Sequence, residues 1–199
     1  MEKQSSLASL CNLGLVAFQY LLIGVLWFLT VMFGFGFTIG ASTVAAYITI
    51  AKIKSGESDK VIYPFFHGFF KNFIKSTIIW VIIMLIQRIA IFNLLNSNFF
   101  GSFSSIAWII NAFILFELFF ISLYIFPMIA KYENKMIAYF KNSLTLLHGH
   151  LFKSLTLGIM FIVILFFIFK IQYTFVFIMV PIYFFSSDSL FTDLYKKYE

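Results

Sequence analysis

The stretch GFTIGASTVAAY, residues 36–47, decides the fold, because it consists largely of small side chains in a chain that otherwise favours Phe, Ile and Leu. Its glycines are four residues apart, and two of its alanines repeat that spacing. Small residues at this spacing share a helix face and let two helix backbones approach closely in a membrane. We predict a helix-packing face, turned either to the chain's own bundle or to a partner, made by Gly36, Gly40, Ala41, Ser42 and Ala45.

The composition around this stretch is that of an integral membrane protein. The 199 residues are 62% hydrophobic and 11% charged, whereas an ordinary soluble domain is about 25% charged. The one cysteine, Cys11, excludes an internal disulfide. We therefore predict an all-α integral membrane protein in which residues 1–199 form a single transmembrane helical domain.

Apolar runs broken by charges or turn residues predict about six transmembrane helices. The second of these runs is the shortest and the most polar. The six predicted segments are residues 13–33, 38–53, 73–95, 105–130, 152–169 and 172–187.

Two linkers between these segments predict cytoplasmic helices that lie in the membrane interface. The first, KIKSGESDKVIYPFFHGFFKN (residues 52–72), carries an aromatic band beside a lysine, a pattern typical of interfacial helices. The second, residues 131–154, has a similar composition. Each linker follows an Ile-Ala-Lys and ends in Lys-Ser, which suggests a parallel internal repeat. The predicted interfacial side chains are Tyr63, Phe65, Phe66, Phe69 and Lys71.

The lysines predict the orientation. With both termini in the cytoplasm, all basic residues except Arg88 and Lys170 lie on the cytoplasmic side and form an inner group. The positive-inside rule favours this orientation. Lysines near a bilayer edge attract anionic lipid, so the net charge of +6 predicts membrane lipids as partners and not nucleic acid. The inner group is Lys3, Lys52, Lys54, Lys60, Lys71, Lys75, Lys131, Lys135, Lys141, Lys153, Lys196 and Lys197.

Arg88 and Glu117 are the ionisable residues deepest in apolar runs. Counted from the inner lysines, both lie about 20 Å into the membrane. An unpaired charge in hydrocarbon is costly, so we predict an intramembrane ion pair between neighbouring antiparallel helices, with Gln87 and Asn111 nearby. The favoured interpretation is a structural polar contact that holds the two helices together, and the alternative is a substrate or proton site.

Residues suited to catalysis or metal binding are sparse. The histidines His148 and His150 have no Cys, Asp or Glu beside them in sequence, and a metal site needs three or four ligands. No nucleophile stands with a base, and no pair of carboxylates is apparent. The sequence thus predicts a protein that is not an enzyme and has no cofactor, catalytic residues or metal site.

Four stretches of the chain resemble the YesL-like family of bacterial membrane proteins, a domain of unknown function. They are TIGASTVAAY (38–47), SGE (55–57), FFHGFFKNFIKSTIIW (65–80) and YIFPMIAKYENK (124–135). Genes of this family often accompany carbohydrate ABC importers. The resemblance therefore implies a multi-pass protein of the bacterial cell membrane that serves as a non-enzymatic accessory subunit, in contact with importer permease subunits and supporting importer assembly, stability or specificity. A small stand-alone transporter or channel, with a solute path near Arg88 and Glu117, is the alternative.

Overall fold

The computed structural model describes residues 2–171 and 176–195, with side chains for all of these except 2–13, 171, 193 and 195. Within these ranges the chain is helical and contains no strand. The elements are α1 (Glu2–Phe33), α2 (Ile39–Lys54), α3 (Ile62–Leu95), the 3₁₀ segment η1 (Ser97–Phe103), α4 (Ser104–Lys131), α5 (Met136–Gly149), α6 (Leu151–Phe166), the π-helical segment η2 (Phe167–Ile171) and α7 (Val176–Tyr195).

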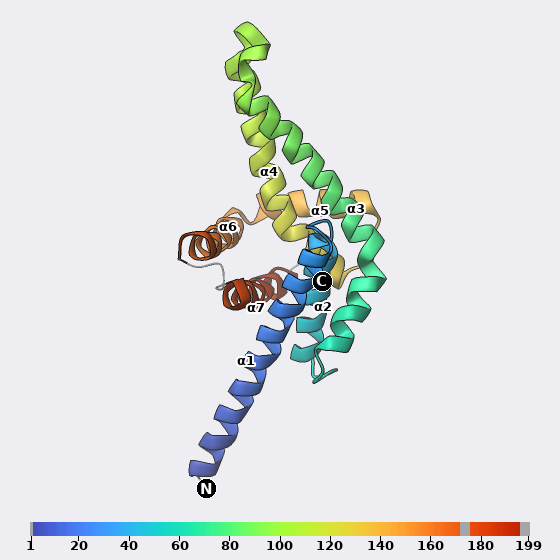
Figure 1. Cartoon of the computed structure of the whole chain (residues 1–199), viewed down its shortest axis with the longest axis vertical. Coiled ribbons are helices and arrows are strands. Elements are labelled where there is room, and N and C mark those ends of the chain that lie inside the picture. Colours follow the sequence, from blue (N-terminus) through green and yellow to red (C-terminus); the bar gives the residue numbers. More distant parts are fainter. Residues whose placement is uncertain (1, 172–175, 196–199) are drawn as a thin grey trace.

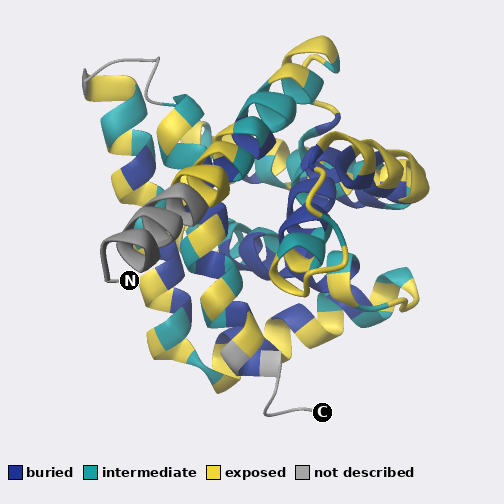
Figure 2. Ribbon diagram, turned by 90° about the horizontal axis from the view of Figure 1, so that it is seen from below, coloured by how far each residue is buried: buried dark blue, intermediate teal, exposed yellow. Residues whose placement is uncertain are grey.

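Helix α2 is the central element, because neighbours cover it on several sides. It packs against α1, α3, α4 and α7, and most of its residues are buried. Buried residues gather where these helices meet, and exposed residues lie on their outer faces (Figure 2). A helix surrounded in this way has little room for large side chains, which accounts for the small residues of its sequence.

The turn between α1 and α2 is a compact C-cap. The backbone N–H of Gly36 donates to the carbonyl of Val31 (3.0 Å), and that of Phe35 donates to Met32 (3.1 Å). These two hydrogen bonds form the Schellman pattern, in which the donor that comes earlier in the chain occupies the left-handed region. Here the earlier donor is Phe35, at φ 49°, a position where glycine is the usual residue.

Helix α3 is one continuous helix, and this corrects the predicted separate interfacial helix in the first linker. The aromatic band from Tyr63 to Phe70 forms the first turns of the helix that continues to Leu95. No glycine or proline interrupts residues 69–95, and Pro64 lies in the first turn, where proline is tolerated. The second linker does contain a separate helix, α5, which ends at Gly149 before α6 starts. The two linkers that suggested a repeat are therefore built differently.

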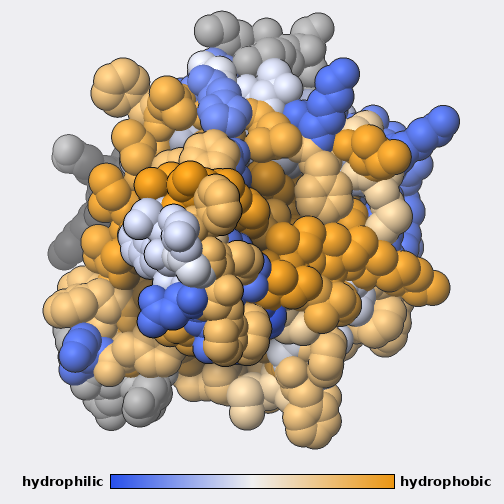
Figure 3. Space-filling model, turned by 90° about the horizontal axis from the view of Figure 1, so that it is seen from above, coloured by the Kyte–Doolittle hydropathy of each residue, from blue (hydrophilic) through white to orange (hydrophobic). Residues whose placement is uncertain are grey.

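The second half of α3 and the first half of α4 form a two-helix arm joined by η1, which extends beyond the rest of the molecule (Figure 1). Between them, the Asn93 side-chain amide donates to the Asn111 side-chain carbonyl (3.2 Å), and Asn111 donates to the backbone of Ala107 (2.7 Å). Large apolar side chains cover the outside of the arm, including Ile89 and Ile109, which are 61% and 62% exposed. Seen from the end of the arm, most of the surface is apolar (Figure 3).

Helices α6 and α7 are steeply inclined to α1, α3 and α4. Figure 1 shows them nearly end-on while the other three run along the page. Helix α7 is held to α1 by a close approach at Gly24, where a Cβ atom would overlap the Pro181 ring, and by an edge contact between Tyr20 and Phe185. Membrane helices are tilted from the membrane normal by about 20° on average. The two groups of helices therefore cannot both have this average tilt.

Four stretches within the described ranges are long and apolar enough to cross a membrane by length and composition: Gly14–Phe33, Ile62–Leu95, Ser97–Lys131 and Leu151–Lys170. This supports a membrane protein but not the predicted count of six. Helix α2 has 16 residues, fewer than the ~20 that a span needs. The sixth predicted segment is seen as the shorter apolar stretch Val176–Thr192. Its first residues, 172–175, lie outside the described part, as do Lys196 and Lys197.

Candidate functional site

The predicted packing face is used inside the molecule. Ala41, Ser42 and Ala45 are fully buried. At Gly40, an added Cβ atom would lie 2.5 Å from the backbone oxygen of Ser76 in α3 and 2.8 Å from the ring of Phe126 in α4. The close approach of α2 to its own neighbours therefore accounts for this face.

Gly36 has a different place from the other four residues of that set. It lies in the turn before α2 at φ 80°, and its carbonyl accepts a hydrogen bond from the Trp80 indole N–H (3.0 Å). This contact attaches the turn to the middle of α3. Two further hydrogen bonds join α1 to α2. The Thr30 hydroxyl donates to the Ser42 hydroxyl (2.8 Å), and the Trp27 indole N–H donates to the Thr43 hydroxyl (3.1 Å).

The structure does not bring Arg88 and Glu117 together, and the predicted ion pair is wrong. Their heights are similar: Arg88 precedes Asn93 by five residues, Glu117 follows Asn111 by six, and the two asparagines are paired. Their directions differ, however. Arg88 is exposed and lies five residues after the buried Ile83. Five residues correspond to a rotation of about 140° round the helix, so Arg88 points away from the buried face that contains Ile83.

Glu117 instead faces α5. Its carboxylate Oε1 lies 3.4 Å from Nε2 of His148, and its side chain is only 12% exposed. Neither carboxylate oxygen accepts a hydrogen bond from the described residues. Counting along two helices could predict the height of Glu117 but not its partner, because His148 comes from a third helix.

No group of three or more His, Cys, Asp or Glu side chains that could hold a metal ion occurs among the described residues. Some polar contacts that the sequence did not predict join different helices. Two are buried hydroxyl pairs, Tyr47–Ser187 (2.8 Å) and Tyr124–Ser154 (2.8 Å), and a third is the exposed salt bridge Lys54–Asp188 (2.6 Å).

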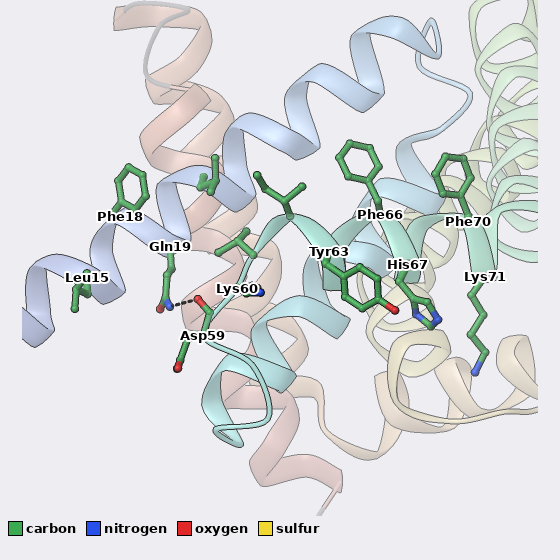
Figure 4. A pocket seen from close by; sticks show the side chains of 13 residues that line it. Leu15, Phe18, Gln19, Asp59, Lys60, Tyr63, Phe66, His67, Phe70 and Lys71 are labelled. Atoms are coloured by element: carbon green, nitrogen blue, oxygen red, sulfur yellow. Dashed lines mark hydrogen bonds between the residues drawn. The ribbon is translucent and has the colours of Figure 1, made fainter.

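An open groove of about 970 Å³ lies between α1 and the beginning of α3. The loop before α3 closes one end of it, where the Gln19 side-chain amide donates to the backbone oxygen of Asp59 (3.0 Å; Figure 4). The groove is lined by Leu15, Phe18, Gln19, Leu22, Asp59, Lys60, Val61, Ile62, Tyr63, Phe66, His67, Phe70 and Lys71.

The α3 wall of the groove carries two stripes. Tyr63, His67 and Lys71 follow at intervals of four and point to one side, whereas Phe66 and Phe70 point to the other (Figure 4). The rings of Tyr63 and His67 are 5.9 Å apart, and those of Phe66 and Phe70 are stacked at 6.3 Å. Apolar and basic groups therefore run side by side over two turns of the helix.

The predicted interfacial set divides between the groove and the core. Tyr63, Phe66 and Lys71 line the groove, while Phe65 and Phe69 are 0% and 7% exposed and belong to the core. The latter two therefore pack inside the bundle, and the interfacial depth of the set stays a prediction. Phe65 and Phe69 share the face of α3 that packs against α2, because four residues return a helix to nearly the same direction.

Lys71 lines the groove and also has a partner outside it. Its ammonium donates to the Glu133 carboxylate, in the segment between α4 and α5, at 2.9 Å. This hydrogen bond, with the charges of Lys71 and Lys75, lowers the pKa of Glu133 below its usual value. Both side chains of the pair are well exposed, at 60% and 82%, so the pair contributes little to stability.

Comparison with known proteins places part of the chain in a family model. The model described as "Protein of unknown function, DUF624" matches residues 20–94. The matched residues contain α2, nearly all of α3, and the loop and α3 residues of the groove. No curated protein and no solved structure matches the chain.

Proposed function

We propose that this chain is a YesL-like, non-enzymatic accessory subunit that packs in the bacterial cell membrane against permease subunits of a carbohydrate ABC importer. In that role it supports the assembly, stability or specificity of the importer. The importer as partner is implied by the sequence resemblance, and the structural support comes from the arm.

The apolar arm of α3 and α4 is the observation that carries the proposal. Its two helices contact each other, and their outer side chains remain exposed over several turns. Lipid or another membrane protein can cover such a surface. The small-residue face, by contrast, is already covered within the bundle and is not offered to a partner.

The experiment is affinity purification of the tagged protein in mild detergent from cells that make the importer. We expect permease subunits to be recovered with it. Recovery of the protein alone, consistently and from such cells, would refute the proposal.

Paired substitutions then test the arm. Ile89→Ala with Ile109→Ala shortens two outward side chains of the arm, and Ile159→Ala with Ile162→Ala is the matched control on α6, where the residues are 61% and 60% exposed. We expect the arm variant, and not the control, to lose permease recovery. Equal recovery from both variants would exclude the arm as the contact surface.

A stand-alone solute path has less support. The side chains that would line it diverge, since Arg88 is exposed, Glu117 faces His148, and Asn111 is bonded to Asn93 and Ala107. Solute uptake by liposomes that contain only this protein would favour this alternative over the accessory role.

We also propose that both termini are cytoplasmic, on the basis of the lysine distribution. Reporter domains fused to either end test the orientation. Activity of a periplasm-dependent reporter at either terminus would refute it.

A further inference from the structure

We propose that the groove between α1 and α3 binds one anionic phospholipid. Its acyl chain lies against Phe66 and Phe70, and its phosphate headgroup lies against Lys60 and Lys71. This inference is independent of the importer as partner. It assigns a specific ligand class to a surface for which the sequence predicted only a position near the membrane.

The apolar wall fits an acyl chain. Leu15 and Phe18 of α1 are 59% and 64% exposed, and Phe70 of α3 is 70% exposed, although all three line a concave surface. The volume of about 970 Å³ is at the upper end of the range for ligand pockets. A flexible apolar chain is the occupant that would remove most of this surface from water.

The polar edge fits an anionic headgroup. Two lysines, Lys60 and Lys71, line the groove together with one carboxylate, Asp59, and the imidazole of His67. Among the lining residues the full charges therefore sum to +1. The contact of Lys71 with Glu133 is an exposed pair that stabilises little, so a lipid phosphate can replace or share it. An anionic headgroup is favoured over a zwitterionic one because the latter brings its own cation.

The arrangement of the two stripes indicates a lipid and not a soluble phosphate compound. The phenylalanine stripe lies about 80° round α3 from the stripe of Tyr63, His67 and Lys71. A ligand that satisfies both must carry an apolar chain and a charged head side by side, as a lipid does at the membrane interface. Tyrosine and lysine are residues typical of that boundary.

The test is native mass spectrometry of the full chain in detergent, titrated with phosphatidylglycerol and separately with phosphatidylcholine. We expect one phosphatidylglycerol molecule to be retained in preference to phosphatidylcholine. Each lysine near a membrane surface contributes about a factor of five. Lys60→Gln with Lys71→Gln should therefore weaken phosphatidylglycerol retention roughly twenty-five-fold and leave phosphatidylcholine unchanged. Lys135→Gln with Lys141→Gln, at two exposed lysines outside the groove, is the matched control.

A second pair of variants tests the acyl wall. Phe70→Ala should weaken both lipids by a similar factor, roughly fivefold from the lost apolar contact, whereas Phe152→Ala, at an 89% exposed phenylalanine outside the groove, should change neither. Lys60→Arg with Lys71→Arg retains both charges and should restore the preference. Circular dichroism of each variant confirms that it is folded.

Three results would overturn the proposal. The first is equal retention of the two lipids by the unaltered protein. The second is an equal loss in the two Lys→Gln variants, which would indicate a general surface charge effect. The third is displacement of the lipid by soluble glycerol phosphate, which would indicate a site for the phosphate group alone.

Discussion

Replacing Gly40 by alanine should destabilise the protein, because this is where α2 lies closest to two neighbours. The new Cβ atom would lie 2.5 Å from the backbone oxygen of Ser76, 2.8 Å from the Phe126 ring and 3.0 Å from Cβ of Trp80, against an ordinary contact distance of 3.4 Å or more. The Ser76 oxygen belongs to the α3 backbone and cannot rotate away. The helices must therefore separate by an appreciable fraction of an ångström, which also loosens the packing around the contact.

Overpacking of this kind costs about 1–3 kcal/mol, and we expect the upper part of that range because three groups are met at once. Alanine regains up to about 1 kcal/mol over glycine as a helix former. The expected net loss in the free energy of unfolding is thus about 1–2 kcal/mol.

Gly14→Ala is the matched control. Gly14 lies in α1, where an added Cβ atom would have no described atom of a neighbouring segment within 4 Å, so the same substitution should be neutral or stabilising by up to about 1 kcal/mol. Unfolding by SDS titration in mixed micelles measures both variants. If Gly40→Ala proves as stable as Gly14→Ala, the close approach of α2 to α3 and α4 is refuted.

Three further predictions concern side chains away from α2. Phe35→Gly should stabilise the protein by about 0.5–1 kcal/mol in the same titration, because Phe35 is left-handed at φ 49° and 91% exposed; a loss of stability would contradict the C-cap. A double-mutant cycle of Glu117→Gln and His148→Gln should give a coupling of about 0.5 kcal/mol, and zero coupling would contradict their contact. Since the pKa of Glu133 is lowered by Lys71, the stabilisation from this pair should be present near pH 7 and decline as the pH falls below about 4.5, so that the difference in stability between Glu133→Gln and the parent protein shrinks with falling pH; a difference that stays constant as the pH falls would be inconsistent with it.

Local patterns in the sequence predicted the positions of the main helices well. The apolar runs at 38–53 and 105–130 correspond to α2 and α4 within one or two residues, because long apolar stretches form helices wherever backbone groups must be satisfied internally. The first linker was less predictable. An interfacial pattern and the first turns of a longer helix look alike in sequence, and α3 continues because no helix-breaking residue follows its aromatic band.

Partners in space were not predictable in the same way. The heights of Arg88 and Glu117 could be counted along their helices, but their directions depend on how α3 and α4 rotate against α2 and α5. The same rotation placed Phe65 and Phe69 in the core and Phe66 and Phe70 in the groove. Neighbouring positions in one aromatic band thus have different environments.

The sequence by itself determined an all-helical chain with long apolar segments and one stretch of small residues suited to close helix contact, since these properties depend on composition and local spacing. Only the tertiary structure decided that this stretch is covered by the chain's own helices, that Glu117 faces His148, and that a groove forms beside α1. The physical reason is that hydrophobicity is nearly uniform around α1, α2, α3 and α4. The faces that meet are then selected by shape and by a few polar contacts between residues distant in sequence, such as Tyr47 with Ser187.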